Sequence, residues 1–83
     1  MNKSNPSRLT RERHHMPDFV KDALTGKNLM DAYSKRPPYQ QNDYVGWITR
    51  AKRIETRNKR LTQMLDELAR GDRYMKMVYN SKK

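Results

Sequence analysis

The sequence predicts an all-α fold: a small helical domain of three to four helices, with an antiparallel C-terminal helix pair and a disordered basic N-terminus. Apolar residues recur three and four positions apart, which is the spacing of amphipathic helices. No segment shows the alternation of apolar and polar residues that marks a half-buried strand. The 83 residues, 34% of them hydrophobic, provide material for a single small core.

Two short helices are predicted between residue 16 and the proline pair at 37–38. Pro17 suits the first position of a helix, and Gly26 is suited to end it. A second helix is expected to begin after Asn28, which is an acceptable N-cap. It must end before the prolines, because proline disfavours helix in the residue before it and lacks the N–H group that continues a helix.

The third predicted helix runs from about residue 38 to Lys52. At about 100° per residue, Tyr44, Trp47 and Ile48 fall on one face, which indicates a stripe that faces the core. A platform on which nucleic-acid bases stack is the alternative interpretation of the aromatic residues. Gly46 falls on the opposite side, where it costs about 1 kcal/mol relative to alanine unless another segment approaches it closely.

The fourth predicted helix spans about Ile54 to Ala69, and Gly71 is positioned to end it. Because only one or two residues separate it from the third helix, the two are expected to form an antiparallel hairpin or a helical corner. The residues from Asp72 onward could extend the helix, dock on the core or fray. The third and fourth helices are expected to share one core, formed by Tyr44, Trp47, Ile48, Leu61, Leu65 and Leu68.

The formal net charge of +10 implies affinity for polyanions. Residues 1–15 are interpreted as a disordered basic leader, residues 16–77 as the helical domain and residues 78–83 as a basic tail. The leader and residues 72–83 each carry an excess of three positive charges. Since basic chain ends bind polyanions without selectivity, the net charge is weak evidence for a dedicated nucleic-acid site.

Six cations flank the junction between the third and fourth helices. They form the candidate anion-binding or partner-binding site: Arg50, Lys52, Arg53, Arg57, Lys59 and Arg60. The last three lie in the first two turns of the fourth helix, where the helix dipole disfavours positive charge. Positive potential is thus concentrated beside the N–H groups of a helix start, which favours an anion. The alternative is a solvated face on which the arginine stems pack against the core.

The sequence offers little for catalysis or metal binding. There is no cysteine, so disulfides and thiolate metal sites are excluded. His14 and His15 are adjacent in a predicted coil without further ligands nearby, and no nucleophile–base pattern or glycine-rich phosphate loop is present. We therefore expect no catalytic residue, metal, cofactor or enzymatic activity. The acidic residues interpreted as helix-end and surface charges are Asp43, Glu55, Asp66 and Glu67.

The stretch 37–60, PPYQQNDYVGWITRAKRIETRNKR, resembles the core signature of the bacterial YdeI/OmpD-associated family, also called bacteriocin-protection proteins. A helix opened by proline carries Trp47 and Ile48, and it is followed by Ala-Lys-Arg and then by Glu-Thr-Arg. The resemblance extends from about residue 16 to residue 77. It implies a helical module with a role in protection against bacteriocins or cationic antimicrobial peptides.

We expect a non-enzymatic helical interaction module of this stress-resistance family, acting through an acidic or envelope-associated protein. The alternative is a small basic nucleic-acid-binding protein that uses the Arg50–Arg60 cluster for non-specific contacts. No apolar run reaches the roughly 18 residues of a membrane span, and no secretory signal is evident. A cytoplasmic location is therefore expected.

Overall fold

The structure is a computed structural model, and it describes residues 14–78 of the chain. The elements in chain order are the helices α1 (Asp18–Gly26), α2 (Met30–Lys35), α3 (Pro38–Thr49) and α4 (Ile54–Arg70), followed by the strands β1 (Arg73–Tyr74) and β2 (Met77–Val78). The two strands pair in antiparallel orientation. Most of the predicted basic leader and the last five residues of the predicted tail lie outside the described residues.

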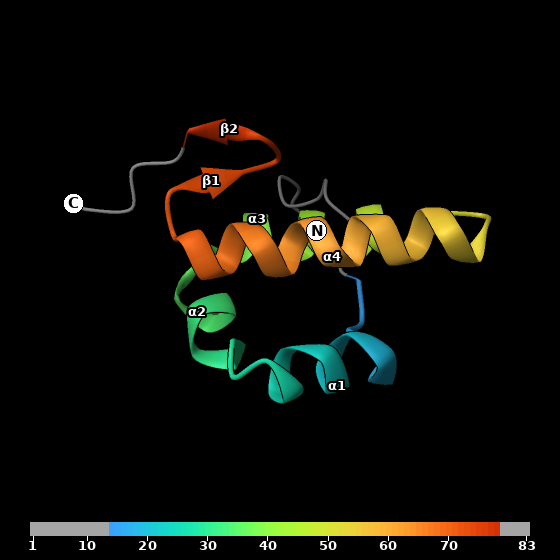
Figure 1. Cartoon of the computed structure of the whole chain (residues 1–83), viewed down its shortest axis with the longest axis horizontal. Helices are drawn as coiled ribbons and strands as arrows, with labels where there is room; N and C mark the ends of the chain where they lie inside the picture. The colour runs from blue at the N-terminus through green and yellow to red at the C-terminus, as the bar shows by residue number, and fades with distance from the viewer. Residues whose placement is uncertain (1–13, 79–83) are drawn as a thin grey trace, which may run out of the picture.

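Among the described elements, α4 is the longest helix, and it crosses the middle of the molecule (Figure 1). α1 and α2 lie along one side of it, and the β1–β2 hairpin lies on the opposite side, beside the end of α4 (Figure 1). α3 lies behind α4 in this view. One hydrogen bond between side chains joins the two helices, and a second runs from the Arg60 side chain to the main-chain carbonyl of Trp47. The mostly helical fold predicted from the sequence is confirmed, with a small two-stranded sheet added.

The β1–β2 hairpin is a correction, because no strand was predicted after Gly71. Each strand contains only two residues, so the alternation that identifies a strand from sequence cannot develop. The turn between the strands consists of Met75 and Lys76, whose φ angles of 52° and 68° lie in the left-handed region. Glycine or asparagine usually marks such a turn, and neither is present at these two positions.

Proline and glycine set helix ends where the sequence predicted them. Pro38 occupies the first turn of α3. Gly71 ends α4 with a φ of 83°, and its N–H donates to the carbonyl oxygen of Glu67 at 2.9 Å. α3 ends at Thr49, earlier than predicted, because the chain turns over residues 50–53 before α4 begins.

Side chains from all four helices form the core, whereas the expected core drew on the third and fourth helices alone. The buried apolar residues are Val20, Leu24, Tyr33, Tyr44, Val45, Ile48, Met64 and Leu68. Three of the six expected core residues are in this set. The other three are partly buried and pack against it: Trp47, Leu61 and Leu65. α1 and α2 therefore complete the core that α3 and α4 begin.

Gly46 marks a close approach between α3 and the chain that precedes α1. A Cβ atom at this position would lie 2.6 Å from Nε2 of His14. The backbone N–H of His14 also donates to Oδ1 of Asn42 at 2.7 Å. The glycine expected on the far face of α3 is thus covered by another segment. His14 packs with the helical domain, although it was assigned to the basic leader.

Candidate functional site

The six cations singled out in the sequence, here called the basic corner, lie where α3 ends and α4 begins. The basic corner consists of Arg50, Lys52, Arg53, Arg57, Lys59 and Arg60. Arg50 is the C-cap of α3 and Arg53 is the N-cap of α4, with Lys52 in the turn between them. The junction forms one end of the molecule in Figure 1. The fold therefore gathers all six residues around one short turn and the two helix ends beside it.

Two of the six arginine and lysine side chains are held against aromatic rings. The guanidinium carbon of Arg57 lies 4.0 Å from the centre of the Phe19 ring. That of Arg60 lies 5.3 Å from the Trp47 ring, and its Nη1 donates to the Trp47 carbonyl oxygen at 2.7 Å. These contacts combine cation–π attraction with packing of the side-chain stems. Arg57 and Arg60 thus follow the alternative interpretation of the sequence, in which arginine stems pack against the core.

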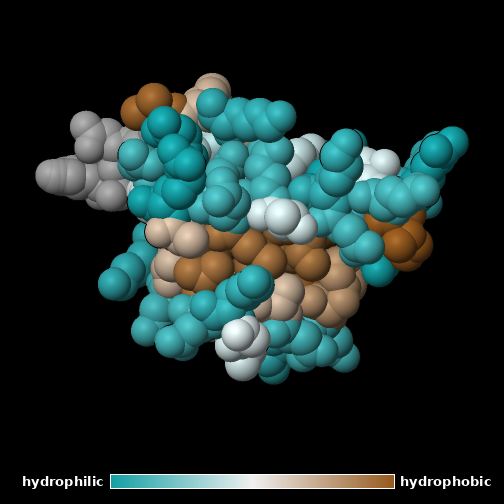
Figure 2. Space-filling view, in the orientation of Figure 1, coloured by the Kyte–Doolittle hydropathy of each residue, from teal (hydrophilic) through white to brown (hydrophobic). Residues whose placement is uncertain are grey.

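The other four cations of the basic corner are exposed: Arg50, Lys52, Arg53 and Lys59. Arg53 makes no side-chain hydrogen bond that caps α4, and Glu55 is the acidic residue in the first turn of that helix. Ile54 stands beside them with 59% of its surface exposed. In Figure 2, a small apolar area bordered by hydrophilic surface lies at the end of the molecule where α4 begins. The corner is therefore a positive surface with an apolar residue in it.

Glu67 is the polar residue that sequence reasoning placed wrongly. It was interpreted as a surface charge, but only 3% of its surface is exposed. Its Oε1 accepts hydrogen bonds from the Tyr44 hydroxyl and from the N–H of Met75. Its Oε2 accepts from the N–H of Lys76 and from Nε2 of Gln63. One carboxylate thus joins α3, α4 and the hairpin turn.

A weak signal for this burial exists in the sequence. At about 100° per residue, Glu67 lies about 60° from Met64 around α4, on the border of the apolar stripe. A charged residue at such a border can face either solvent or core. The deciding contacts come from Tyr44 and from residues 75–76, which are distant in the chain or belong to the hairpin that the sequence did not predict.

A second buried polar group, the Arg36 guanidinium, is bonded to the main chain of Glu67 and to Gln40. Nη1 of Arg36 donates to Oε1 of Gln40 at 3.1 Å, and its Nη2 donates to the Glu67 carbonyl oxygen at 3.1 Å. Burial raises the pKa of the Tyr44 hydroxyl well above its ordinary value, and the hydrogen bond to Glu67 raises this pKa further. These residues stabilise the interior, because their hydrogen bonds are made to one another and to the backbone.

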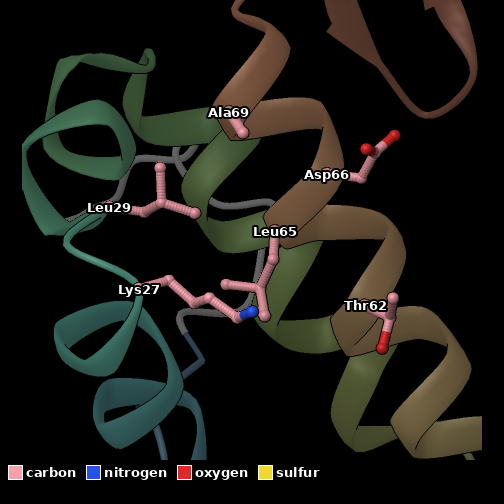
Figure 3. Close-up of a pocket in the computed structure, with 6 residues that line it drawn as sticks. All are labelled: Lys27, Leu29, Thr62, Leu65, Asp66 and Ala69. Atoms are coloured by element: carbon pink, nitrogen blue, oxygen red, sulfur yellow. The ribbon is translucent and has the colours of Figure 1, made fainter.

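A groove of about 400 Å³ runs between α4 and the segment that links α1 to α2 (Figure 3). Its lining residues are Lys27, Leu29, Thr62, Leu65, Asp66 and Ala69. Figure 3 shows Lys27 extending toward Leu65, with Thr62 and Asp66 on the far side of α4. Apolar surface is visible along this side of α4 in Figure 2. No residue singled out as a functional site from the sequence lines this groove.

Neither a metal cluster nor a membrane-spanning helix is found within residues 14–78. No three histidine, aspartate or glutamate side chains in this range are grouped so that they could hold a metal ion. No helix in the same part of the chain is long and apolar enough to cross a membrane.

The fold and the exposed cations define a small, basic helical domain with a positively charged corner. The chain belongs to the family described as bacteriocin-protection, YdeI or OmpD-associated, whose model matches residues 14–71. This match confirms the resemblance based on residues 37–60. The matched segment begins at His14, contains the whole basic corner and ends before the hairpin. Comparisons with curated proteins and with solved structures give no match.

Proposed function

We propose that this domain is a non-enzymatic interaction module that binds an anionic, envelope-associated partner through the exposed part of the basic corner. The observation that carries the proposal is the exposure of Arg50, Lys52, Arg53 and Lys59 around a single turn. Membership of the bacteriocin-protection family supports a protective role exerted through a partner. The described residues offer no metal cluster, and this proposal requires none.

The charges of the basic corner favour a binding role for its exposed members. A cation in the first turns of a helix opposes the helix dipole, at a cost of about 0.3–1 kcal/mol. Arg57 and Arg60 offset this cost through contacts with Phe19 and Trp47. Lys59 lies in the second turn of α4 and is exposed, so its charge can contact an anion outside the chain.

The proposal treats α3 and α4 as an antiparallel pair that presents the corner at one end. The order of contacts supports this arrangement. Trp47, near the end of α3, accepts a hydrogen bond from Arg60, near the start of α4. Tyr44, one turn earlier in α3, donates to Glu67 near the end of α4. Two helices fixed to each other at two levels would hold the turn between them in a defined position.

The hydrogen bonds of the buried polar residues support a non-enzymatic role, because these residues bond to other parts of the protein. Glu67, Arg36 and Gln40 are the buried polar or charged side chains of the described chain. They hydrogen-bond to one another's side chains or backbone and to the hairpin turn. A catalytic carboxylate would instead need access to a substrate.

Heparin, a polyanion without base sequence, provides the test. The corner variant carries Arg50→Gln, Lys52→Gln, Arg53→Gln and Lys59→Gln. The matched control removes the same charge from exposed positions elsewhere, by Lys21→Gln, Lys35→Gln, Arg70→Gln and Lys76→Gln. We expect the corner variant to bind heparin at least about tenfold more weakly than the control at the same ionic strength, because local contacts release more counterions.

Equal weakening by the two variants would contradict the proposal, since binding would then depend on net charge alone. Duplex DNA is the comparison ligand. Tighter binding to DNA than to heparin, lost in the corner variant only, would support the alternative of a nucleic-acid-binding protein.

A further inference from the structure

We infer that the basic corner binds the surface of an anionic lipid bilayer, with Ile54 as the side chain that enters the lipid interface. This inference rests on the proposed function and names the class of its partner. It starts from an exposed apolar residue that the core leaves out. Ile54 is the first residue of α4, and 59% of its surface is exposed at the end of the molecule where α4 extends past α1 (Figure 1).

The residues before Ile54 determine what kind of surface it can contact. Arg50, Lys52 and Arg53 immediately precede it, and all three are exposed. A single exposed aliphatic residue is common on protein surfaces and carries no meaning by itself. An aliphatic residue that projects from a cationic turn is different, because its neighbours exclude it from an ordinary apolar protein interface, where charged residues are depleted.

An anionic bilayer matches both parts of this surface. Its phosphate layer attracts lysine and arginine side chains, and the acyl layer lies a few ångströms beneath for the apolar side chain. The outer surface of duplex DNA offers phosphates without an apolar layer, so Ile54 would remain in water there. The combination of charge and apolar exposure therefore favours lipid over nucleic acid as the anionic partner.

A natural reporter of binding lies beside the basic corner. Trp47 is the only tryptophan of the chain, it is partly buried, and its ring lies beside the guanidinium group of Arg60. A change in the polarity around the corner should alter its fluorescence. The hairpin supplies a control position. Val78 in β2 is 79% exposed, and it lies at the opposite end of α4 from the corner (Figure 1).

The experiment measures binding of the full chain to phosphatidylcholine vesicles with and without phosphatidylglycerol, by co-sedimentation and by Trp47 fluorescence. We expect binding to the anionic vesicles only. Ile54→Ser should weaken this binding about tenfold, because it removes the apolar contribution. Val78→Ser should leave it unchanged, and neither variant should alter binding to heparin. Since both side chains are exposed, both variants should keep the melting temperature of the wild-type chain.

The results that would contradict the inference differ from those that would contradict the proposed function. If Ile54→Ser binds anionic vesicles as tightly as the wild-type chain, the inference is wrong, while the proposed function stands if the corner variant still loses heparin binding. If Ile54→Ser weakens binding to duplex DNA as much as to vesicles, Ile54 does not act by entering lipid, and the inference is also wrong. If the corner and control variants weaken vesicle and heparin binding equally, the proposed function itself fails.

Discussion

The hydroxyl of Tyr44 donates a hydrogen bond to the buried carboxylate of Glu67, which lies 23 residues later in the chain. The bond joins α3 to α4, and two further hydrogen bonds of the same carboxylate attach the hairpin turn to α4. The charged group that organises the interior is thus separate from the cations at the surface. Stability and binding can therefore be tested by different substitutions.

Glu67→Gln should destabilise the domain by about 2–4 kcal/mol. The amide group keeps one acceptor oxygen but turns an NH2 group toward hydrogen-bond donors, and buried bonds to a charged group contribute about 1.5–3 kcal/mol each. Urea denaturation followed by circular dichroism measures the loss. Asp66→Asn, at an exposed neighbouring position, is the control and should change stability by less than about 0.5 kcal/mol. Unchanged hydrogen exchange of the Met75 and Lys76 amides in E67Q would contradict the proposed hold on the turn.

Stability should fall in alkaline solution. Burial raises the pKa of Tyr44 and of Tyr33, and the bond to Glu67 adds to the shift at Tyr44. Above the ordinary tyrosine pKa of about 10, the unfolded chain loses these protons while the folded chain keeps them. The contribution of these two tyrosines to the free energy of unfolding should therefore be constant below about pH 10 and then fall by up to about 1.4 kcal/mol per pH unit for each tyrosine.

Urea denaturation at a series of alkaline pH values measures this slope. Tyr44→Phe removes one of the two titrating groups, so its slope should be shallower although the variant is less stable at neutral pH. A free energy of unfolding that stays constant while exposed tyrosines ionise would show that the two hydroxyls have ordinary pKa values.

Gly46→Ala should displace His14 from α3. The new Cβ would lie 2.6 Å from the imidazole Nε2 and 3.2 Å from Nη1 of Arg50, so the histidine ring must move. In the wild-type chain, losing the packing of the His14 ring offsets the gain in helix propensity from alanine. The net change in the free energy of unfolding should be less than about 1 kcal/mol. In a His14→Ala background the conflict with the ring is removed, and Gly46→Ala should then stabilise by about 0.5–1 kcal/mol. A double-mutant cycle by thermal denaturation measures the difference, and additive effects would contradict the contact.

Arg60→Gln should destabilise the domain by about 1–2 kcal/mol, because it removes a hydrogen bond to the Trp47 carbonyl and the contact with the Trp47 ring. The helix dipole alone would make Arg60→Gln stabilising, since a cation near the start of α4 is unfavourable. Lys59→Gln is the matched control on the same turn and should change stability by less than about 0.5 kcal/mol. A stabilised Arg60→Gln variant, measured in urea, would show that the dipole outweighs the aromatic contact.

The helix ends could be predicted from sequence because proline and glycine act locally. Pro38 and Gly71 determine their own backbone conformations, whatever the rest of the chain does. The location of the basic corner followed in the same way, since its residues are close in sequence. Its division into exposed and packed cations could not be predicted. That division depends on where Phe19 and Trp47 lie in the fold.

The hairpin and the burial of Glu67 could not be predicted because each explains the other. Two-residue strands give no periodic signal, and Met75 and Lys76 show no preference for the left-handed conformation that they adopt. The conformation is stabilised by a carboxylate that itself looks solvent-facing in the sequence. Neither feature can be inferred until the other is known.

The hydrogen bonds from the hairpin turn to Glu67 affect which amino-acid changes the turn can tolerate. The carboxylate binds the main-chain N–H groups of residues 75 and 76, and every amino acid except proline supplies such a group. These hydrogen bonds therefore leave the turn some freedom in its side chains while Glu67 is retained, limited by the packing of Met75 against the core and by the positive φ angles, which glycine or asparagine would relieve. Loss of Glu67 would remove this freedom, and the turn would then depend on its own sequence to fold.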